Sequence, residues 1–481
     1  MPYRDLQHFL EVLDSKGLLR RIKAEVSQDL EITEITDRAV KKGGPALLFE
    51  NVRGHSIPVA INLFGTNERM ALALEAESID ALPERLHTFL SLALNPPTGG
   101  FIEKLKTLPK LWEAAGFLPK TVGGGPVKEV VKTGEAVDLA KLPVLKCWPK
   151  DGGRFITFPM VFTFDPETGR RNVGCYRMQV YDAKTTGAHF HWHKDAARHV
   201  RKAKGKIEVA AAIGCDPAVC FAGTLPLPPD VDEMIFAGLI RQEGVALTKA
   251  ETVDIKVPAN AEIVLEGWID PAERRMEGPF GDHTGYYSLE DEFPVFHVTA
   301  ITHREKPVYH TIVVGPPVAE DDFMGYAIER LFLPLMKLQL PEVVDYHMPF
   351  EGVFHNLIIV SIKKQFPGHA RKVMHAIWGL PQAMFSKVIV VVDEDVNPRD
   401  VREVAWKALN HIDPERDMEF VMGPVDILDH ASRLPGYGSH VGVDATTKWP
   451  GEGFTRRWPD ELVMSPDVKA IVEKKWRELG L

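Results

Sequence analysis

Apolar residues at the start of the chain repeat with the period of an α-helix. Across residues 5–16, Leu6, Phe9 and Leu13 fall on one helical face, and Gly17 follows where glycine commonly ends a helix. The same reasoning predicts the other elements of this region, which are helices over 29–42 and 80–94 and short strands at 46–49 and 58–61. We therefore expect a small α/β domain over residues 1–115.

The pattern changes to period two in the middle of the chain. Alternating apolar and polar positions, separated by Gly and Pro, predict strands, while a single clear helix is predicted over 231–243. The predicted strands are 155–163, 173–181, 207–213, 263–269 and 295–302. Strands at this spacing favour an antiparallel barrel or sandwich over residues 116–312.

Alternating helices and strands return in the last third of the chain. Continuous β-branched runs at 357–362 and 387–392 are typical of buried parallel strands, and helices are predicted over 369–379 and 398–410. This pattern predicts a second α/β layer over residues 313–481.

A last helix is predicted over about 466–479, with Val468, Ile471, Val472 and Trp476 on one face. Such an apolar stripe usually packs on the core of its own chain. Near a chain end, packing on another subunit is an alternative.

Composition excludes several classes of protein. The chain has 481 residues, of which 26% are charged, and a formal net charge of -10, which argues against nucleic acid as the main partner. No secretory signal precedes the first helix, and no run of about 18 apolar residues is present. Four cysteines in so long a chain do not form a disulfide framework. These features predict a reduced, cytoplasmic protein.

Two segments carry candidate metal ligands. If residues 187–193 form a strand, His189, His191 and His193 share one face, and neutral imidazoles bind divalent transition metals. The alternative is a polar strand face with ordinary histidines. Glu233 opens the predicted helix over 231–243, where an acid usually serves the helix dipole but is also rigidly placed for a metal.

A pair of acids marks the segment 277–287, which reads EGPFGDHTGYY. Glu277 and Asp282 flank a Gly-Pro-Phe-Gly turn, so both carboxylates can project into one cavity. Two close carboxylates shift each other's pKa values apart, and a facing Arg could keep one of them ionised. The alternative is a solvated, charged turn. A second segment, 436–450, is predicted to be a glycine-rich loop, but it fits neither a dinucleotide-binding fingerprint nor a Walker loop.

Taken together, these segments resemble the UbiD family of carboxy-lyases over nearly the full chain length. The motifs that carry the resemblance occur in family order: NVGCYRMQ, EIVLEGWI, EGPFGDHTGYY, VVVDEDVNPRD and GVDATTKWPGEG. The resemblance implies an N-terminal α/β domain, a central split β-barrel that binds flavin, and a C-terminal α/β domain used in oligomerisation. It also implies decarboxylation of an aromatic acid with prenylated FMN as the cofactor.

The resemblance assigns roles to individual residues. Asn172, His193 and Glu233 match the ligands of a divalent cation, manganese (Mn2+) in the family, which bridges to the flavin phosphate. Only the last histidine of the triplet is assigned, which argues against a three-histidine site. The other assigned positions are Thr157 and Pro226 lining the flavin, the backbone carbonyls of Ala222, Gly223 and Leu225 around potassium (K+), and Arg177, Glu277 and Asp282 as the catalytic trio.

One departure from the family concerns the glycine-containing segment. Many members carry Lys where this chain has His440, so no role is assigned there, whereas Lys448 is retained.

The resemblance narrows the substrate to two acids of quinone biosynthesis. The variant GDHTGYY and the segments HFHWHKDAARH, VVDYHMPFEGVFHN and ARKVMHAIWG favour 1,4-dihydroxy-6-naphthoate, free or prenylated, for menaquinone. A 4-hydroxy-3-polyprenylbenzoate for ubiquinone, or another aromatic or heteroaromatic acid, is the alternative. A flavin-binding assembly protein without activity is a third hypothesis, which the retained acids and Arg177 disfavour.

The resemblance also predicts partners. A flavin prenyltransferase would supply the cofactor, and the chain would form a homo-oligomer, a dimer or a hexamer, through its last helix. A prenylated substrate would need an apolar channel or peripheral membrane contact.

Overall fold

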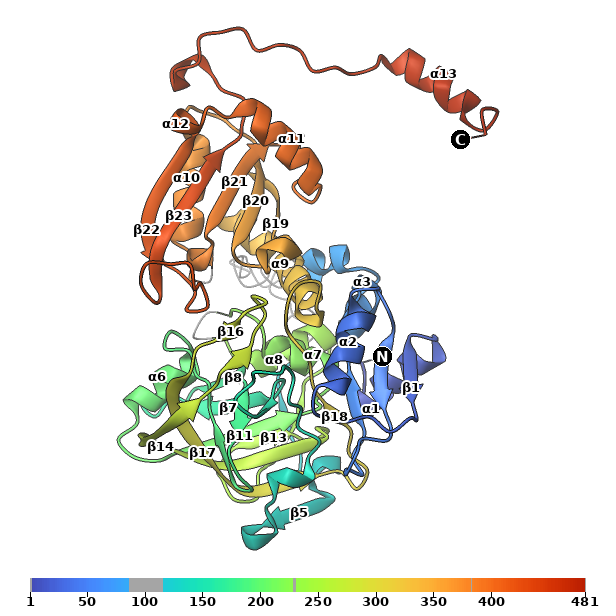
Figure 1. Cartoon of the computed structure of the whole chain (residues 1–481), viewed down its shortest axis with the longest axis vertical. Helices are drawn as coiled ribbons and strands as arrows, with labels where there is room; N and C mark the ends of the chain where they lie inside the picture. Colours follow the sequence, from blue (N-terminus) through green and yellow to red (C-terminus); the bar gives the residue numbers. More distant parts are fainter. Residues whose placement is uncertain (1, 86–115, 228–230, 382, 481) are drawn as a thin grey trace, which may run out of the picture.

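The computed structural model describes residues 2–85, 116–227, 231–381 and 383–480 (Figure 1). The N-terminal region folds around a mixed sheet in which β1 and β2 are parallel, β2 and β3 antiparallel, and β3 and β18 parallel. Its elements are α1 (Leu6–Ser15), β1 (Leu19–Ile22), α2 (Glu31–Val40), β2 (Ala46–Phe49), β3 (Val59–Ile61), α3 (Asn67–Ala73) and β18 (Tyr309–His310). The predicted helices over 5–16 and 29–42 and both strands are confirmed. Most of the predicted helix over 80–94 lies outside the described residues.

A large antiparallel sheet, here called the central sheet, forms the middle of the molecule. In sheet order its strands are β6 (Arg154–Ile156), β9 (Met178–Val180), β10 (Thr185–Gly187), β17 (Asp291–His303), β14 (Ile263–Glu277), β11 (Ile207–Ile213), β7 (Met160–Phe164) and β8 (Arg171–Cys175), while β5 (Val130–Thr133) pairs with β17. The strands curve into a half-barrel (Figure 1). The antiparallel prediction for this region is confirmed.

Two predicted strands of the central sheet are each divided in two. The stretch 155–163 is interrupted before β7, where Pro159 cannot donate to a ladder. The stretch 173–181 is interrupted at Tyr176 and Arg177, and this break directs the Arg177 side chain out of the ladder. The two breaks therefore contain Thr157 and Arg177, which are predicted site residues.

Short elements cover the central sheet. A small sheet contains β4 (Lys120–Thr121), β12 (Ala246–Lys249) and β13 (Lys256–Pro258), and a hairpin pairs β15 (Phe280–Gly281) with β16 (Tyr287–Ser288). The helices are α6 (Asp195–Lys202), α7 (Pro217–Ala222) and α8 (Glu233–Arg241). The helix predicted over 231–243 corresponds to α8, whereas α6 and α7 were not predicted because each spans barely two turns.

Helix α9 (Glu320–Gln339) leads from the central sheet to a second sheet, here called the C-terminal sheet (Figure 1). Its order is β19 (Val343–His347), β20 (Leu357–Ile362), β21 (Val388–Asp393), β23 (Tyr437–Asp444) and β22 (Met418–Pro424). The inner strands are parallel and the two edge strands antiparallel to their neighbours. Helices α10 (His369–Trp378), α11 (Val401–His411) and α12 (Pro414–Asp417) accompany it, so the predicted second α/β layer is confirmed.

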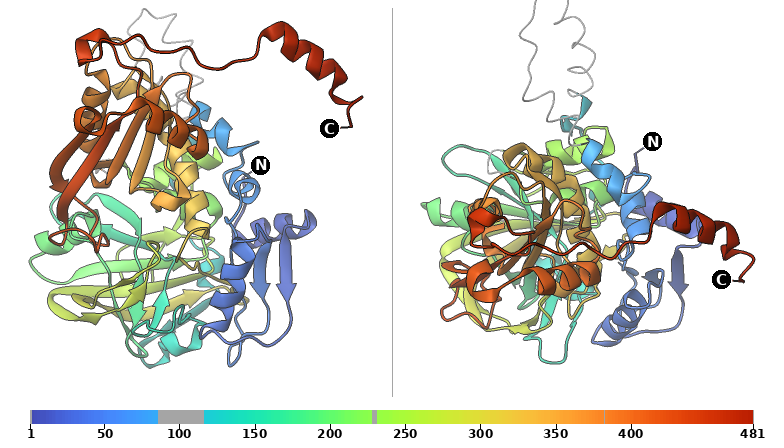
Figure 2. Two further views of the ribbon diagram at one scale, coloured as in Figure 1. Left: turned by 45° about the horizontal axis from the view of Figure 1, so that its top comes forward. Right: turned by 90° about the horizontal axis from the view of Figure 1, so that it is seen from above.

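The chain ends in an extended segment and helix α13 (Pro466–Trp476), which project away from the C-terminal sheet in all views (Figures 1 and 2). The apolar face predicted for this helix is present but is not covered by any other residue that the structure describes: Ile471 is 51% exposed and Trp476 47%. Among the described residues, α13 therefore does not pack on the core of its own chain. Within the described ranges, none of the helices combines the length and apolarity needed to cross a membrane.

Candidate functional site

Three buried charged side chains meet where the central sheet faces the C-terminal sheet. Arg177 follows β8, Glu277 is the last residue of β14, and Asp282 follows β15. The Arg177 guanidinium donates through Nε to Glu277 Oε1 at 2.9 Å, through Nη2 to Glu277 Oε2 at 3.2 Å, and through Nη1 to Asp282 Oδ2. The short turn between Glu277 and Asp282 therefore directs both carboxylates toward one arginine, as the spacing of the two acids in the sequence suggested.

The guanidinium is fixed from two further sides. Its Nη2 donates to Ser288 Oγ at 3.0 Å, and its carbon lies 4.6 Å from the centroid of the Phe280 ring. Phe155 packs on Phe280 with the ring centroids 4.7 Å apart. A planar cation above an aromatic face and in a two-pronged bond to a carboxylate has little rotational freedom. Arg177 is therefore held ready to receive an anion.

Each acid also has its own histidine. His189 Nδ1 lies 3.0 Å from Glu277 Oε2, and His283 Nδ1 lies 3.0 Å from Asp282 Oδ1. The backbone N–H of His283 donates to the same Asp282 oxygen at 2.8 Å. His189 and His283 both occur in the segments that the sequence singled out, but His189 was considered only as a metal ligand and His283 was assigned no role.

The two histidines differ in their protonation. Burial, followed by the charge of Arg177, lowers the pKa of His189. Burial would also lower the pKa of His283, but its hydrogen bond to Asp282 and the charge of that carboxylate outweigh burial and raise the pKa to about 9. The Asp282 pair is therefore a carboxylate with an imidazolium, and His189 is neutral.

Both acids are ionised near neutral pH in this arrangement. Burial raises the pKa of Glu277, but the bond from His189 and the charge of Arg177 outweigh it and bring the pKa to about 2. Burial also raises the pKa of Asp282, but its hydrogen bond to His283 and the charge of Arg177 outweigh burial and hold that pKa well below its usual range. A proton must therefore reach one of these acids before it can act as a donor.

A separate cavity of about 320 Å³ lies beside β8 and α8. Asn172 and Glu233 both line it. The cavity is also lined by Asp165, Thr168, Arg170, Arg171, Asp195, Arg198, His199 and Lys202. Glu233 Oε2 accepts the Val173 N–H at 3.0 Å, so the first turn of α8 is bound to β8. The structure brings these two predicted metal ligands together.

The chemistry of this cavity fits a cation next to a phosphate. Burial, assisted by the charges of Asp232 and Asp195, raises the pKa of Glu233 to about 8. Carboxylate and amide oxygens are hard donors suited to manganese or magnesium. Basic side chains on the same lining, Arg171 and Lys202 among them, suit an anionic group.

The third predicted ligand lies elsewhere in this structure. His193 does not line the cavity, and its ring centroid is 4.9 Å from that of Phe385, which precedes β21. Across the described part of the chain, no group of three or more His, Cys, Asp or Glu residues is arranged to hold a metal. The premise for the three-histidine site is wrong, because β10 ends at Gly187 and residues 188–193 are not a strand.

The remaining predicted positions lie around α7. The Gly223 carbonyl accepts the Cys175 N–H at 2.8 Å, and the Ala222 carbonyl accepts the Leu225 N–H at 3.2 Å. Each carbonyl oxygen has a second lone pair for a cation. Leu225 is buried and Pro226 is half-buried beside them.

Thr157 lies apart from α7, between β6 and β7. Its hydroxyl bonds the Ile312 carbonyl at 2.6 Å and faces Thr311 Oγ1 at 2.7 Å. These bonds tie the central sheet to the segment after β18.

The segment 436–450 is not a ligand loop, because residues 437–444 form strand β23. A side chain at Gly442 would clash with Met374 of α10, so this glycine serves helix–sheet packing. His440 is buried, and its Nδ1 lies 2.7 Å from the Ser386 carbonyl.

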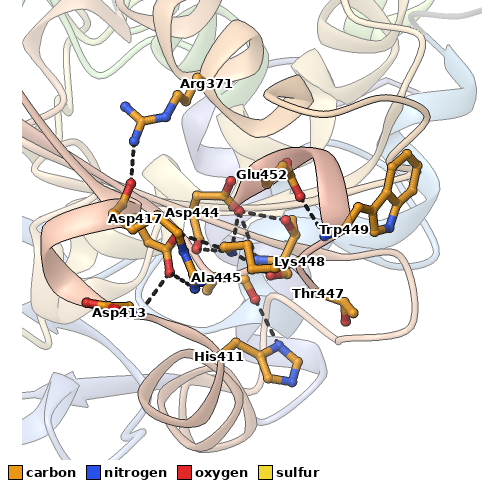
Figure 3. A network of polar contacts seen from close by, with 12 residues as sticks. Arg371, His411, Asp413, Asp417, Asp444, Ala445, Thr447, Lys448, Trp449 and Glu452 are labelled. Carbon is orange, nitrogen blue, oxygen red and sulfur yellow. Dashed lines mark hydrogen bonds and ion pairs between the residues drawn. The ribbon is translucent and has the colours of Figure 1, made fainter. Parts of the chain in front are cut away.

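Lys448 is enclosed in a polar network of its own (Figure 3). Its ammonium donates to the Asp444 carbonyl at 2.7 Å, Asp444 Oδ1 at 3.0 Å and the Thr446 carbonyl at 2.6 Å. These bonds use all three ammonium hydrogens. Lys448 therefore stabilises the end of β23.

Comparison with known families identifies all three parts of the chain. Residues 10–87 match the N-terminal domain model of 3-octaprenyl-4-hydroxybenzoate carboxy-lyase, residues 120–317 its Rift-related domain, and residues 322–445 its C-terminal domain. Two full-length relatives, from Archaeoglobus fulgidus and Aquifex aeolicus, are 52% and 50% identical and uncharacterized; each alignment covers 100% of this chain and 99% of the relative.

Solved structures share the whole architecture. Vanillic acid decarboxylase from Sedimentibacter hydroxybenzoicus, in its closed form, superposes with a TM-score of 0.85 at 29% identity, covering 100% of this chain and 99% of that one. The UbiD-class enzyme HmfF from Pelotomaculum thermopropionicum, in complex with FMN, gives a TM-score of 0.80 at 31% identity, covering 98% and 100%. A dimeric evolved form of HmfF with prFMN gives 0.77 at 31% identity, covering 97% and 98%.

Proposed function

We propose, from the premise that this chain belongs to the UbiD family of carboxy-lyases, that Arg177, Glu277 and Asp282 carry out its chemistry. The chain is a decarboxylase of an aromatic acid. The observation that supports the assignment is the buried arginine that bonds both acids at once. A protein that only stores flavin has no need for two desolvated carboxylates on one guanidinium, because burying such charges is costly.

We propose prenylated FMN as the cofactor, with Mn2+ and K+ beside it. Asn172 and Glu233 would hold the divalent cation, and His193, which does not line the cavity in this structure, is the third ligand that the family resemblance implies. Thr157 and Pro226 would line the flavin, and the carbonyls of Ala222, Gly223 and Leu225 would hold potassium. When bound, the flavin supplies the electron sink that loss of carbon dioxide from an aromatic ring requires.

The protein's own groups position the acid and control protons. Arg177 binds the substrate carboxylate and aligns the bond that breaks. Burial of the site excludes water and strengthens these charge contacts. As the carbon–carbon bond breaks and carbon dioxide leaves, an acid must deliver one proton to the ring carbon. Asp282 or Glu277 would be that donor.

We propose 1,4-dihydroxy-6-naphthoate, free or prenylated, as the substrate, on a route to menaquinone. The support is the pairing of Asp282 with His283 in GDHTGYY and the histidine-rich segments around 189–199 and 345–356. A ring hydroxyl would assist by sharing the developing negative charge. A 4-hydroxy-3-polyprenylbenzoate on the ubiquinone route is the second candidate.

We further propose the assembly and partners that follow. The division at residues 115/116 and 312/313 would separate an N-terminal domain, a split-barrel flavin domain and a C-terminal domain. Helix α13 would dock on a second copy of this chain in a dimer or hexamer, since its apolar face is uncovered. A cytoplasmic flavin prenyltransferase would supply the cofactor, and a prenylated substrate would require peripheral membrane contact.

The deciding experiment measures carbon dioxide release from both acids side by side. The chain would be co-produced with a flavin prenyltransferase, kept anaerobic, and supplied with manganese and potassium. Turnover of the naphthoate alone supports the menaquinone route, and turnover of the benzoate alone replaces it with the ubiquinone route. Turnover of neither, with the flavin bound as judged by mass, overturns both substrate proposals.

A further inference from the structure

His283 joins the central sheet to the C-terminal sheet directly behind the catalytic acid. Its Nε2 lies 2.9 Å from Nε2 of His355, which precedes β20, while its Nδ1 faces Asp282. Two ring nitrogens at this distance share one hydrogen, so one ring donates and the other accepts. Burial, followed by the charge of His283, lowers the pKa of His355 to about 4, which makes His355 the neutral acceptor.

The loop that carries His355 is built to hold this contact. The Phe354 ring stacks on the His283 ring with centroids 5.3 Å apart and an interplanar angle of 25°. Val353 and Phe354 both adopt positive φ, 44° and 48°, which is unfavourable for bulky residues and persists only where the surroundings enforce it. Gly325 of α9 leaves the space that Phe354 fills, because a Cβ there would lie 2.7 Å from the Phe354 Cβ.

Several charged and titratable groups face the His283 ring. They are Asp282 on its own turn, His355 of the C-terminal sheet, Asp321 in the first turn of α9, and Asp426 between β22 and β23. Burial, followed by Asp322, raises the pKa of Asp321 to about 8. Burial also raises the pKa of Asp322, which interacts with His283, but only to about 6, so Asp282, Asp322 and Asp426 supply most of the negative charge near neutral pH. The surroundings thus favour a positively charged His283.

We propose that His283 stores the proton that replaces the substrate carboxyl group and passes it through Asp282, while His355 of the C-terminal sheet holds His283 in position. The inference rests on the proposed roles of Arg177 and Asp282. It assigns the donor role to Asp282 rather than Glu277, because only Asp282 is bonded to a histidine with a proton to give.

The transfer balances with one proton per turnover. The His283 Nδ1–H proton moves to Asp282, and the carbon–carboxyl bond breaks heterolytically to release carbon dioxide. The electron pair left on the ring carbon then takes the proton from Asp282, forming the new carbon–hydrogen bond. Asp282 is then again a carboxylate, and His283 is left as a neutral imidazole until it takes up one proton from solvent. The His283 side chain is 19% exposed, so solvent can return its proton between turnovers.

The first test measures the charge of His283 without relying on turnover. Exchange of the histidine C2 hydrogen for deuterium, followed by mass spectrometry of the full chain over pH 5–10, reports the titration midpoint of each histidine. We expect a midpoint for His283 at least about 2 units above the ordinary value near 6.5. Asp282→Asn should return it towards that value. A wild-type His283 midpoint below 7 would overturn the proposal.

The second test separates proton delivery from folding. His283→Asn keeps a donor to Asp282 at the Nδ1 position but cannot release a proton, so kcat should fall about 100-fold with KM little changed. His355→Phe keeps a ring against Phe354 but loses the bond to His283, and it should lower both kcat and the His283 midpoint. His375→Asn in α10 is the matched control. Unchanged kcat in His283→Asn would overturn the delivery step.

The two tests distinguish failure of the proposed decarboxylase function from failure of the proton-delivery step alone. If the wild-type holoenzyme released carbon dioxide from none of the aromatic acids while the His283 midpoint was raised, the proposed function would fail, and the delivery step with it. A normal His283 midpoint in an active decarboxylase would instead overturn this inference alone.

Discussion

Arg177 shows how a single side chain organises the site. Its three nitrogens donate four hydrogen bonds to Glu277, Asp282 and Ser288, which leaves one of the five N–H groups of the guanidinium for a substrate carboxylate. The spacing of the two acids was readable from the sequence because a five-residue turn can aim both inward. His355 and Asp321 were not predictable, because they reach the site from elements about 70 and 40 residues further along the chain, and only the fold brings them close.

Arg177→Lys tests the geometry of this charge rather than its sign. Lysine keeps a positive charge but cannot bond both Glu277 oxygens and Asp282 from one planar group. We expect carbon dioxide release to fall about 100-fold or more while the thermal midpoint changes little. Arg154→Lys, at a half-exposed pair with Asp29, is the matched control. Wild-type activity in Arg177→Lys would remove the arginine from the catalytic trio.

Glu320 gives the chain a stability that depends on pH. Its carboxylate accepts the backbone N–H groups of Asn62 and Phe64, and burial raises its pKa to about 7 from 4.5. Between these values the unfolded chain has lost the proton and the folded chain has kept it. The stabilisation of the folded chain by protonated Glu320 is therefore fully present below pH 4.5 and is lost as pH rises through 7.

The size of this effect follows from the shift, at about 1.4 kcal/mol per pKa unit, or about 3 kcal/mol in total. Glu320→Gln cannot titrate, so the difference in thermal midpoint between wild type and variant should shrink from pH 5 to pH 8. Scanning calorimetry at the two pH values measures it. A constant difference across this range would contradict the assignment to Glu320.

At the scale of elements, the sequence predicted those whose own residues determine them. The strands β20 and β21 are continuous apolar runs, and α1 and α2 have clear apolar faces, so all four were found. Most of the predicted glycine-rich loop is instead strand β23, in which Gly442 makes room for α10 rather than for a turn. The need for glycine at this position comes from a neighbouring helix, so the sequence of the segment itself does not indicate a strand.

Helix α9 offers a test of how elements fit together at the site. Gly325→Ala should strengthen the helix by about 1 kcal/mol in isolation but push Phe354 away from His283. Overpacking of this kind costs about 1–3 kcal/mol, so the helix gain should be offset and kcat should fall. The measurement is kcat together with the thermal midpoint. Leu338→Ala, exposed on the same helix, is the control, and unchanged kcat in Gly325→Ala would mean that Phe354 does not affect catalysis.

At the scale of the whole molecule, the sequence predicted the kind of each sheet better than the relation between the sheets. The strands of each sheet can be recognised from the periodicity of their own apolar residues, whereas the contacts between the two sheets are made by loop residues. The bond from His283 to His355 and the ring contact of His193 with Phe385 both cross from the central to the C-terminal sheet. Function therefore depends on how these two sheets dock, which a single chain's hydrophobic pattern does not encode.

The projecting C-terminal segment has its last fixed contacts at Trp458, whose ring packs against His411, and at Glu461, which pairs with Lys407. Beyond them Leu462 is fully exposed, and α13 follows with no buried residue. A helix of this length gains little stability in water unless its apolar face is covered. A second copy of the chain is the occupant we propose.

Shortening the chain to residues 1–461 should therefore reduce its oligomeric state without unfolding it, because every contact described above is retained. Analytical ultracentrifugation of the full and shortened chains measures the change in mass. Ile471→Ser, on the apolar face, should weaken assembly in the same direction, whereas Glu473→Ser, whose side chain projects away from Ile471, should not. An unchanged mass for the shortened chain would place the subunit interface elsewhere, on the sheets themselves.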